Sequence, residues 1–166
     1  MTTLNRITML AFTCAFSIAA PIASAQTLDD ATMRNGLAAS IASCGAELGG
    51  APADQRALER ARVDVIDPAR PSVTFNRAGP TGPEFLGDPT PRTIYQPVGE
   101  TESCSIFLFQ TAASYPSTLQ LTRAILEQDG WTKASRDRFE KGSVALRIKG
   151  NTTRGLYHRM NLIRTD

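Results

Sequence analysis

The sequence has 166 residues, and its 18 Lys and Arg residues nearly balance its 16 Asp and Glu residues. A near-neutral chain lacks the strong positive charge that is typical of nucleic-acid-binding proteins, so nucleic acid is not the expected partner. With one histidine and three cysteines, the chain also has few side chains that could bind zinc.

Residues 1–25 have the features of a cleaved export signal. Arg6 supplies the positive start, residues 7–20 form an apolar run, and residues 23–25 offer a cleavage site of small side chains. A membrane-spanning helix needs about 20 apolar residues, and Pro21 ends this run early. We therefore expect a periplasmic or extracellular protein with no membrane span after cleavage. Retention as an anchor and lipid attachment are the alternatives.

Cleavage leaves residues 26–166, a length that is typical of one domain. It also removes Cys14, so that Cys44 and Cys104 remain. An even number of cysteines in an oxidising compartment predicts a disulfide bond. A redox-active pair is the alternative, but the two cysteines of such pairs are usually close in sequence. We expect a structural disulfide, and neither a metal ion nor a cofactor.

The first predicted element is a helix that begins near Thr27 and ends at Gly49-Gly50. Thr27 can cap the first amides, and Asp29 and Asp30 suit the positive end of the helix dipole. Four apolar side chains then recur at helical spacing, which predicts a buried stripe that includes one cysteine. These side chains are Leu37, Ile41, Cys44 and Leu48.

The next part of the chain has a less regular pattern. Residues 52–62 predict a short helix, and residues 63–66 and 72–77 predict strands because they are rich in β-branched side chains. Residues 78–91 are rich in proline and glycine, so we expect a long loop. Phe85 near its centre is a candidate contact point for a partner.

From Arg92 onward the pattern predicts a β-α-β-β-β unit. Its elements are strands over residues 92–97 and 104–110, a helix over 115–130, and strands over 131–139, 143–149 and 156–164. Pro97 favours a sheet edge for the first strand, whereas the second is apolar on both faces and is expected to be central. The whole order predicts an α+β domain with a mainly antiparallel sheet, helices on one face and one disulfide.

The only histidine, His158, lies in the last predicted strand. The alternation of the strand places it on the apolar face with Leu156, Met160 and Leu162. A histidine can act as a general base, but the part of the sequence after the export signal has no motif for a nucleophile that would accompany it. We therefore expect a partly buried strand histidine that is hydrogen-bonded to a neighbour.

A hydrolase is nevertheless the second hypothesis for the function. Glu100 and Glu102 precede the predicted central strand and are candidates for paired catalytic carboxylates, with His158 as the other candidate. Solvated loop charge is the simpler interpretation of this pair. The sequence also has no phosphate-binding glycine loop and no dinucleotide-binding motif.

The charges are distributed unevenly along the chain. Residues 131–166 carry nine basic and three acidic side chains, a net charge of +6, whereas residues 26–130 carry a net charge of −5. Alternation in the last two strands places four side chains on one exposed face, which would suit an acidic protein, a glycan or a lipid head group. The four candidate ligand-binding side chains are Arg147, Lys149, Tyr157 and Arg159.

The leading hypothesis is therefore a small exported protein that binds a partner, or acts as an accessory or inhibitory protein, without catalysis. Its ligand would contact the basic strand face or the loop around Phe85. A third hypothesis is an envelope assembly component that binds a peptide at a sheet edge.

Overall fold

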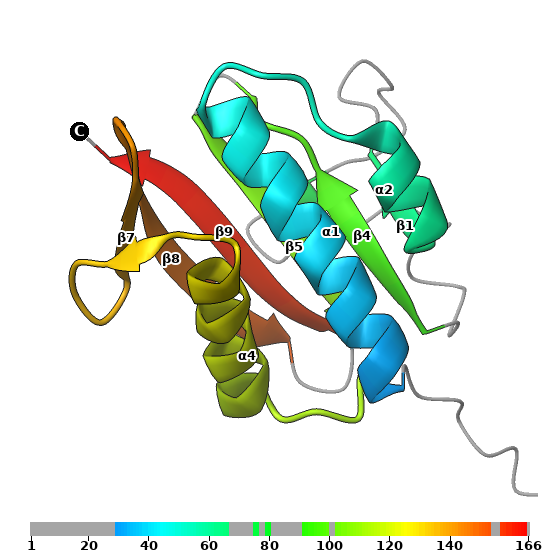
Figure 1. Cartoon of the computed structure of the whole chain (residues 1–166). Helices are drawn as coiled ribbons and strands as arrows, with labels where there is room; N and C mark the ends of the chain where they lie inside the picture. The colour runs from blue at the N-terminus through cyan, green and yellow to red at the C-terminus, as the bar shows by residue number, and fades with distance from the viewer. Residues whose placement is uncertain are drawn as a thin grey trace, which may run out of the picture.

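The computed structural model describes residues 29–66, 75–76, 79–80, 91–99, 102–153 and 157–165. In this part of the chain, helices cover one face of a seven-stranded sheet (Figure 1). The helices are α1 (Asp30–Leu48), α2 (Gln55–Arg60) and α4 (Tyr115–Gln128). The predicted α+β class is thus confirmed. The predicted export signal and Phe85, with most of the loop around it, lie outside the described residues.

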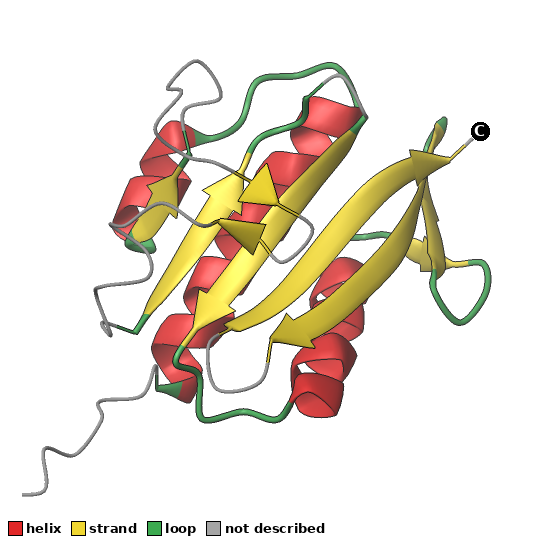
Figure 2. Ribbon diagram, turned by 180° about the vertical axis from the view of Figure 1, so that it is seen from behind, coloured by secondary structure: helices red, strands yellow, loops and turns green. Residues whose placement is uncertain are grey.

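The seven strands are ordered β1-β4-β5-β9-β8-β7-β6. These strands are β1 (Val63–Val65), β4 (Arg92–Gln96), β5 (Ser103–Phe109), β6 (Thr132–Lys133), β7 (Arg138–Lys141), β8 (Val144–Thr153) and β9 (Tyr157–Thr165). Only β1 and β4 pair in parallel, so the sheet is mainly antiparallel, as predicted. A separate pair, β2 (Phe75–Asn76) and β3 (Gly79–Pro80), lies on the side of the sheet away from the helices (Figure 2).

Two details of the predicted sheet are wrong. The strand expected at the edge, β4, lies between β1 and β5, and Pro97 follows its last residue instead of interrupting its pairing. The single strand expected over residues 131–139 is divided into β6 and β7. The amides of Ala134 and Ser135 both donate to the carbonyl oxygen of Arg138, and this tight turn separates the two short strands.

Helix α1 packs its predicted apolar stripe against the sheet. Its four members are each 2% exposed or less. The carboxylate of Asp29 accepts a hydrogen bond of 2.8 Å from the amide of Thr32, so Asp29 caps this helix, and not Thr27 as the sequence suggested. Gly36 permits close contact with β4, because a Cβ atom there would lie 2.6 Å from the Oγ1 atom of Thr93.

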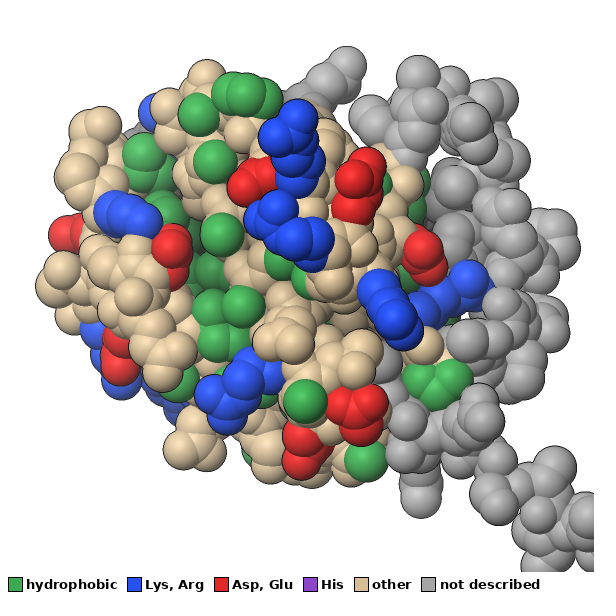
Figure 3. Space-filling view, turned by 45° about the vertical axis from the view of Figure 1, so that its right-hand side comes forward, with side chains coloured by type: hydrophobic (Ala, Val, Ile, Leu, Met, Phe, Trp, Pro, Cys, Tyr) green, Lys and Arg blue, Asp and Glu red, His purple; other side chains and the backbone are tan. Residues whose placement is uncertain are grey.

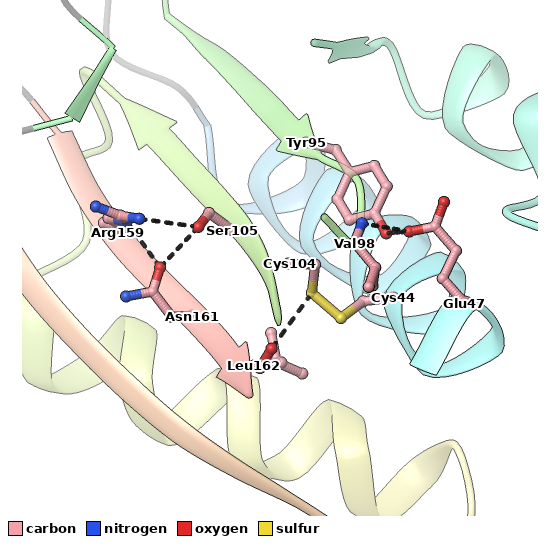
Figure 4. The surroundings of a disulfide bond; sticks show 9 residues. All are labelled: Cys44, Glu47, Tyr95, Val98, Cys104, Ser105, Arg159, Asn161 and Leu162. Carbon is pink, nitrogen blue, oxygen red and sulfur yellow. Dashed lines mark hydrogen bonds between the residues drawn. A yellow bond between two sulfur atoms is a disulfide. The ribbon is translucent and has the colours of Figure 1, made fainter. Parts of the chain in front are cut away.

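The predicted disulfide joins α1 to the central strand β5. Cys44 and Cys104 are fully buried, and their Cα atoms lie 6.0 Å apart (Figure 4). Strand β5 is the third of the seven strands and is buried from Cys104 to Phe109. The bridge therefore links the first helix directly to the middle of the sheet.

A second link joins the end of α1 to the end of β4. The carboxylate of Glu47 accepts a hydrogen bond of 2.6 Å from the hydroxyl of Tyr95 and one of 2.9 Å from the amide of Val98 (Figure 4). Burial, followed by the hydrogen bond to Glu47, raises the pKa of Tyr95 well above its ordinary value. The neutral phenol is thus the form that the fold holds.

We predict that the double variant Cys44→Ala/Cys104→Ala loses about 4 kcal/mol of unfolding free energy, the chain-entropy value for a loop of this length. The bridge spans a sequence separation of 60 residues, so its removal frees a long loop in the unfolded chain. Urea denaturation measures the loss, and the parent protein in reductant should show a similar one. A loss below about 1 kcal/mol would show that the bridge does not stabilise the fold in this way.

We also predict that alkaline pH destabilises the fold through Tyr95. Because the folded state raises the pKa of this phenol, its contribution to stability is complete below about pH 10 and is lost as the pH rises further. Tyrosinate absorbance at 295 nm should show Tyr95 ionising only together with loss of near-ultraviolet circular dichroism. The variant Tyr95→Phe serves as the reference. An ionisation near pH 10 that depends on Tyr95 and leaves the fold intact would contradict this prediction.

Candidate ligand-binding face of the sheet

The sheet face that turns away from the helices, here called the outer face, has a buried half and an open half. On β4, β5, the first residue of β9 and the residue that follows β1, a second apolar cluster is buried. Its members are Ile66, Ile94, Phe107, Phe109 and Tyr157. On β7, β8 and the remainder of β9, the same face carries mainly polar and basic side chains, and those of Arg147, Lys149 and Asn151 are exposed. The acidic Glu140 and the partly buried Ala145 and Ile163 lie on this half as well.

Tyr157 shares the outer face with Arg159 as predicted, but it is not an exposed aromatic side chain. It is only 6% exposed, and its ring lies 5.7 Å from that of Phe107 and 5.1 Å from that of Phe109. Phe109 on β5 lies directly opposite Tyr157, so the first residue of β9 belongs to the buried half of the face. The expectation of a surface contact at Tyr157 is therefore wrong, because neighbouring strands supply aromatic partners that one strand's alternation does not reveal.

Arg147 and Lys149 occupy the predicted exposed positions on β8. Among the described residues, neither has an ion-pair or hydrogen-bond partner. Their guanidinium and ammonium groups are thus available to a ligand on the open half.

Arg138 is a neighbour that the sequence interpretation missed. It lies directly opposite Arg147 across β7 and β8, and its side chain forms an ion pair of 3.1 Å with Glu140. Gly142-Ser143 is a two-residue turn with a φ of 60° at the glycine, and such a turn sets the register of a hairpin. This turn is the sequence signal for the pairing, whereas the predicted strands over 131–139 and 143–149 leave residues 140–142 as the turn.

Arg159 is half-buried and is held by neutral groups. Its guanidinium lies 5.2 Å from the centre of the Phe107 ring. Its Nε donates to the Oδ1 atom of Asn161 over 2.7 Å, and a terminal nitrogen donates to the hydroxyl of Ser105 over 3.1 Å (Figure 4). Burial lowers the pKa of Arg159. The described residues provide no carboxylate partner for this cation.

His158 has the partly buried, hydrogen-bonded environment that the sequence predicts. Its Nδ1 lies 2.9 Å from the Oγ1 atom of Thr152, and its Nε2 lies 3.0 Å from the carbonyl oxygen of Ala113. The ring of Tyr115 packs 5.6 Å away. Both ring nitrogens therefore connect β9 to β8 and to the loop that precedes α4.

The structure does not bring Glu102 and His158 together. Glu102 is exposed and lies 4.0 Å from Arg164 at one end of β9, whereas His158 lies near the other end of that strand. Glu100 is outside the described residues. Within the described part of the chain, no group of three or more His, Cys, Asp and Glu side chains could hold a metal ion.

A cavity of about 500 Å³ opens on the helix side, between the first turns of α1 and α4. Its lining residues are Asp30, Met33, Ala112, Ala113, Ser114, Ser117 and Leu121. In the space-filling view, hydrophobic side chains gather in a strip between the surfaces of α4 and α1, and acidic and basic side chains are interspersed around it (Figure 3). In this view, basic and acidic side chains of the described residues alternate and do not form one basic surface.

Comparison with models of protein families, with curated protein sequences and with solved structures finds no match to this chain. Among the described residues, no helix is both long and apolar enough to cross a membrane.

We predict that the variant His158→Gln folds and loses only about 1 kcal/mol of unfolding free energy. The loss is that of a typical hydrogen bond, because the glutamine amide can replace one of the two contacts of the ring. Thermal denaturation measures this change. Complete loss of an identified enzymatic turnover in a variant that is still folded would instead assign a catalytic role to His158.

Proposed function

We propose that this protein acts after export as a non-enzymatic binding protein, and that an anionic ligand occupies the open half of its outer face. The observation that carries the proposal is the row of three cations at Arg147, Lys149 and Arg159. These side chains share one sheet face and have no carboxylate partner among the described residues.

The position of two of the cations argues against the usual structural use of such charges. Lysine and arginine on edge strands prevent association between sheets. Arg147 lies where β8 pairs with both β7 and β9, and Arg159 lies on β9, between β5 and β8. Edge protection therefore does not account for Arg147 or Arg159, whereas Lys149 lies where β8 pairs with β9 alone among the described residues.

The energetics of the row also favour a ligand. Like charges on neighbouring strand positions repel one another and destabilise the sheet, and Lys149 neighbours Arg147 along β8 and Arg159 diagonally across β8 and β9. A bound anion would offset this repulsion and would gain charge-assisted hydrogen bonds. The open, strand-lined surface suits a ligand that extends across several side chains.

The geometry also bears on the two other hypotheses. The terminal strands of the sheet, β1 and β6, have three and two residues, so each offers few backbone groups to an added peptide. Residues 149–153 of β8 pair with β9 alone among the described residues and leave a longer edge, which lies beside the proposed cationic site. A hydrolase that uses Glu102 or His158 would need further groups near one of them, because the two lie far apart along β9.

We predict that the double variant Arg147→Gln/Lys149→Gln binds dextran sulfate at least 10-fold more weakly than the parent protein. Two of the three proposed cationic contacts are then removed, and each contact to an anionic group contributes on the order of 1 kcal/mol or more. Binding is measured by calorimetry at low ionic strength, where surface charges are least screened.

The matched control is Arg34→Gln/Arg56→Gln, which removes the same charge from exposed positions on α1 and α2. This control should retain most of the affinity. Equal losses in the two double variants would show that net charge, and not the outer face, determines binding. No measurable binding of dextran sulfate by the parent protein would also count against the proposal.

A further inference from the structure

The side chain of Asn161 has an orientation that is fixed by its neighbours. Arg159 Nε can only donate a hydrogen bond, and it lies 2.7 Å from the side chain of Asn161. The facing atom must therefore be the amide oxygen, which also accepts a bond of 2.8 Å from the hydroxyl of Ser105. It follows that the NH2 group of Asn161 turns away from this network (Figure 4).

This arrangement leaves a cluster of hydrogen-bond donors on the outer face. The Asn161 oxygen is occupied by two donors, so the group that the side chain still offers is its NH2. Lys149 lies directly opposite Asn161 in the β8–β9 register, with Cβ atoms about 5 Å apart for such a pair. Arg159 has a guanidinium with five N–H groups, of which the contacts above use two. We name Lys149, Asn161 and Arg159 the donor cluster.

A cluster that offers donors and positive charge suits one anionic group of a ligand. Carboxylate and sulfate oxygens accept hydrogen bonds from amide, ammonium and guanidinium groups, and charge-assisted bonds of this kind are the strong ones. The guanidinium of Arg159 is already held in place by Phe107, Ser105 and Asn161. A held side chain loses less conformational entropy on binding than a free one.

Arg147 provides a second contact at a regular distance. It lies two residues before Lys149 on β8, which corresponds to about 7 Å along a strand. Arg159 is a diagonal neighbour of Lys149 across β8 and β9, at about 7–8 Å. The three cations therefore form a row, and a row matches anionic groups that recur along one linear chain.

The surroundings of the row favour a glycan over a protein. Protein interfaces usually contain apolar or aromatic anchor residues. Among the described residues of the open half there is no aromatic side chain, and the one large apolar side chain, Ile163 opposite Arg147, is partly buried. Exposed Asn151 and the Asn161 amide supply neutral polar groups beside the charges, and these suit the hydroxyl groups of sugars.

We infer that the ligand is a linear acidic glycan and that the donor cluster of Lys149, Asn161 and Arg159 holds one of its carboxylate or sulfate groups. This inference rests on the function proposed above. It adds the class of ligand, and it gives Asn161 a direct contact that depends on its NH2 group and not on charge.

The decisive variant is Asn161→Asp. Aspartate keeps both acceptor contacts, to Arg159 and Ser105, so the fold should be at least as stable as the parent in thermal denaturation. It replaces the NH2 donors with a second carboxylate oxygen, which would repel an anionic ligand. We expect at least a 20-fold loss of affinity for polygalacturonate, which carries carboxylates, or for dextran sulfate, which carries sulfates. The polymer that the parent protein binds more tightly identifies the anionic group.

The matched control is Asn151→Asp, which makes the same change at an exposed position directly opposite Arg159 on the same face. It adds the same charge and also removes the Asn151 amide, so its loss is an upper limit on the effect of added negative charge, and we expect this loss to be at least fivefold smaller than that of Asn161→Asp. Neutral dextran should not bind. Poly-L-glutamate and phosphatidylglycerol vesicles represent an acidic protein and a lipid surface, and both should bind at least 10-fold more weakly than the preferred glycan.

Three results would overturn the inference while the proposed function stands. The first is an equal loss of affinity in Asn161→Asp and Asn151→Asp. The second and third are binding of poly-L-glutamate, or of the vesicles, that is as tight as that of the preferred glycan or tighter. In each case affinity is still lost in Arg147→Gln/Lys149→Gln. If that double variant binds as tightly as the parent, the proposed function itself fails.

Discussion

The structure depends on the covalent link between α1 and β5. This disulfide joins the N-terminal helix to the third strand of the sheet, and both cysteines are fully buried. Glu47 adds a polar link from the same helix to β4. Helices α1 and α4 cover one face of the sheet, and in the described part of the chain no helix packs on the opposite face. Half of it is occupied by a second apolar cluster, and half remains open to solvent.

On the open half, the side chain of Arg159 has a structural role and a proposed role in ligand binding. Arg159 packs on Phe107, and its hydrogen bonds to Ser105 and Asn161 explain why it is half-buried without a carboxylate partner among the described residues. These contacts also hold its guanidinium in one position. The cation is thus part of the packing and is at the same time prepared for an anionic ligand, at a lower entropic cost than a free arginine would have.

Local signals in the sequence predicted a large part of this fold. The stripe of α1 with Cys44, the buried strand β5 and the final meander all follow from periodicity within one element. The sequence did not predict the interior position of β4 or the burial of Tyr157, because both depend on which strands become neighbours. The candidate site is divided in the same way. Arg147, Lys149 and the face of Asn161 follow from alternation, whereas the positions of Arg138 opposite Arg147 and of Asn161 opposite Lys149 depend on the register between strands.

The central claim is that the outer face of β8 and β9 binds an anionic ligand. Its most direct test is a titration of the isotopically labelled protein with dextran sulfate oligomers, followed by nuclear magnetic resonance. The account predicts that the largest shift changes occur at the amides of Arg147 and Lys149 and at the side-chain NH2 of Asn161. Changes that instead concentrate at the cavity between α1 and α4, around Met33 and Leu121, would contradict it.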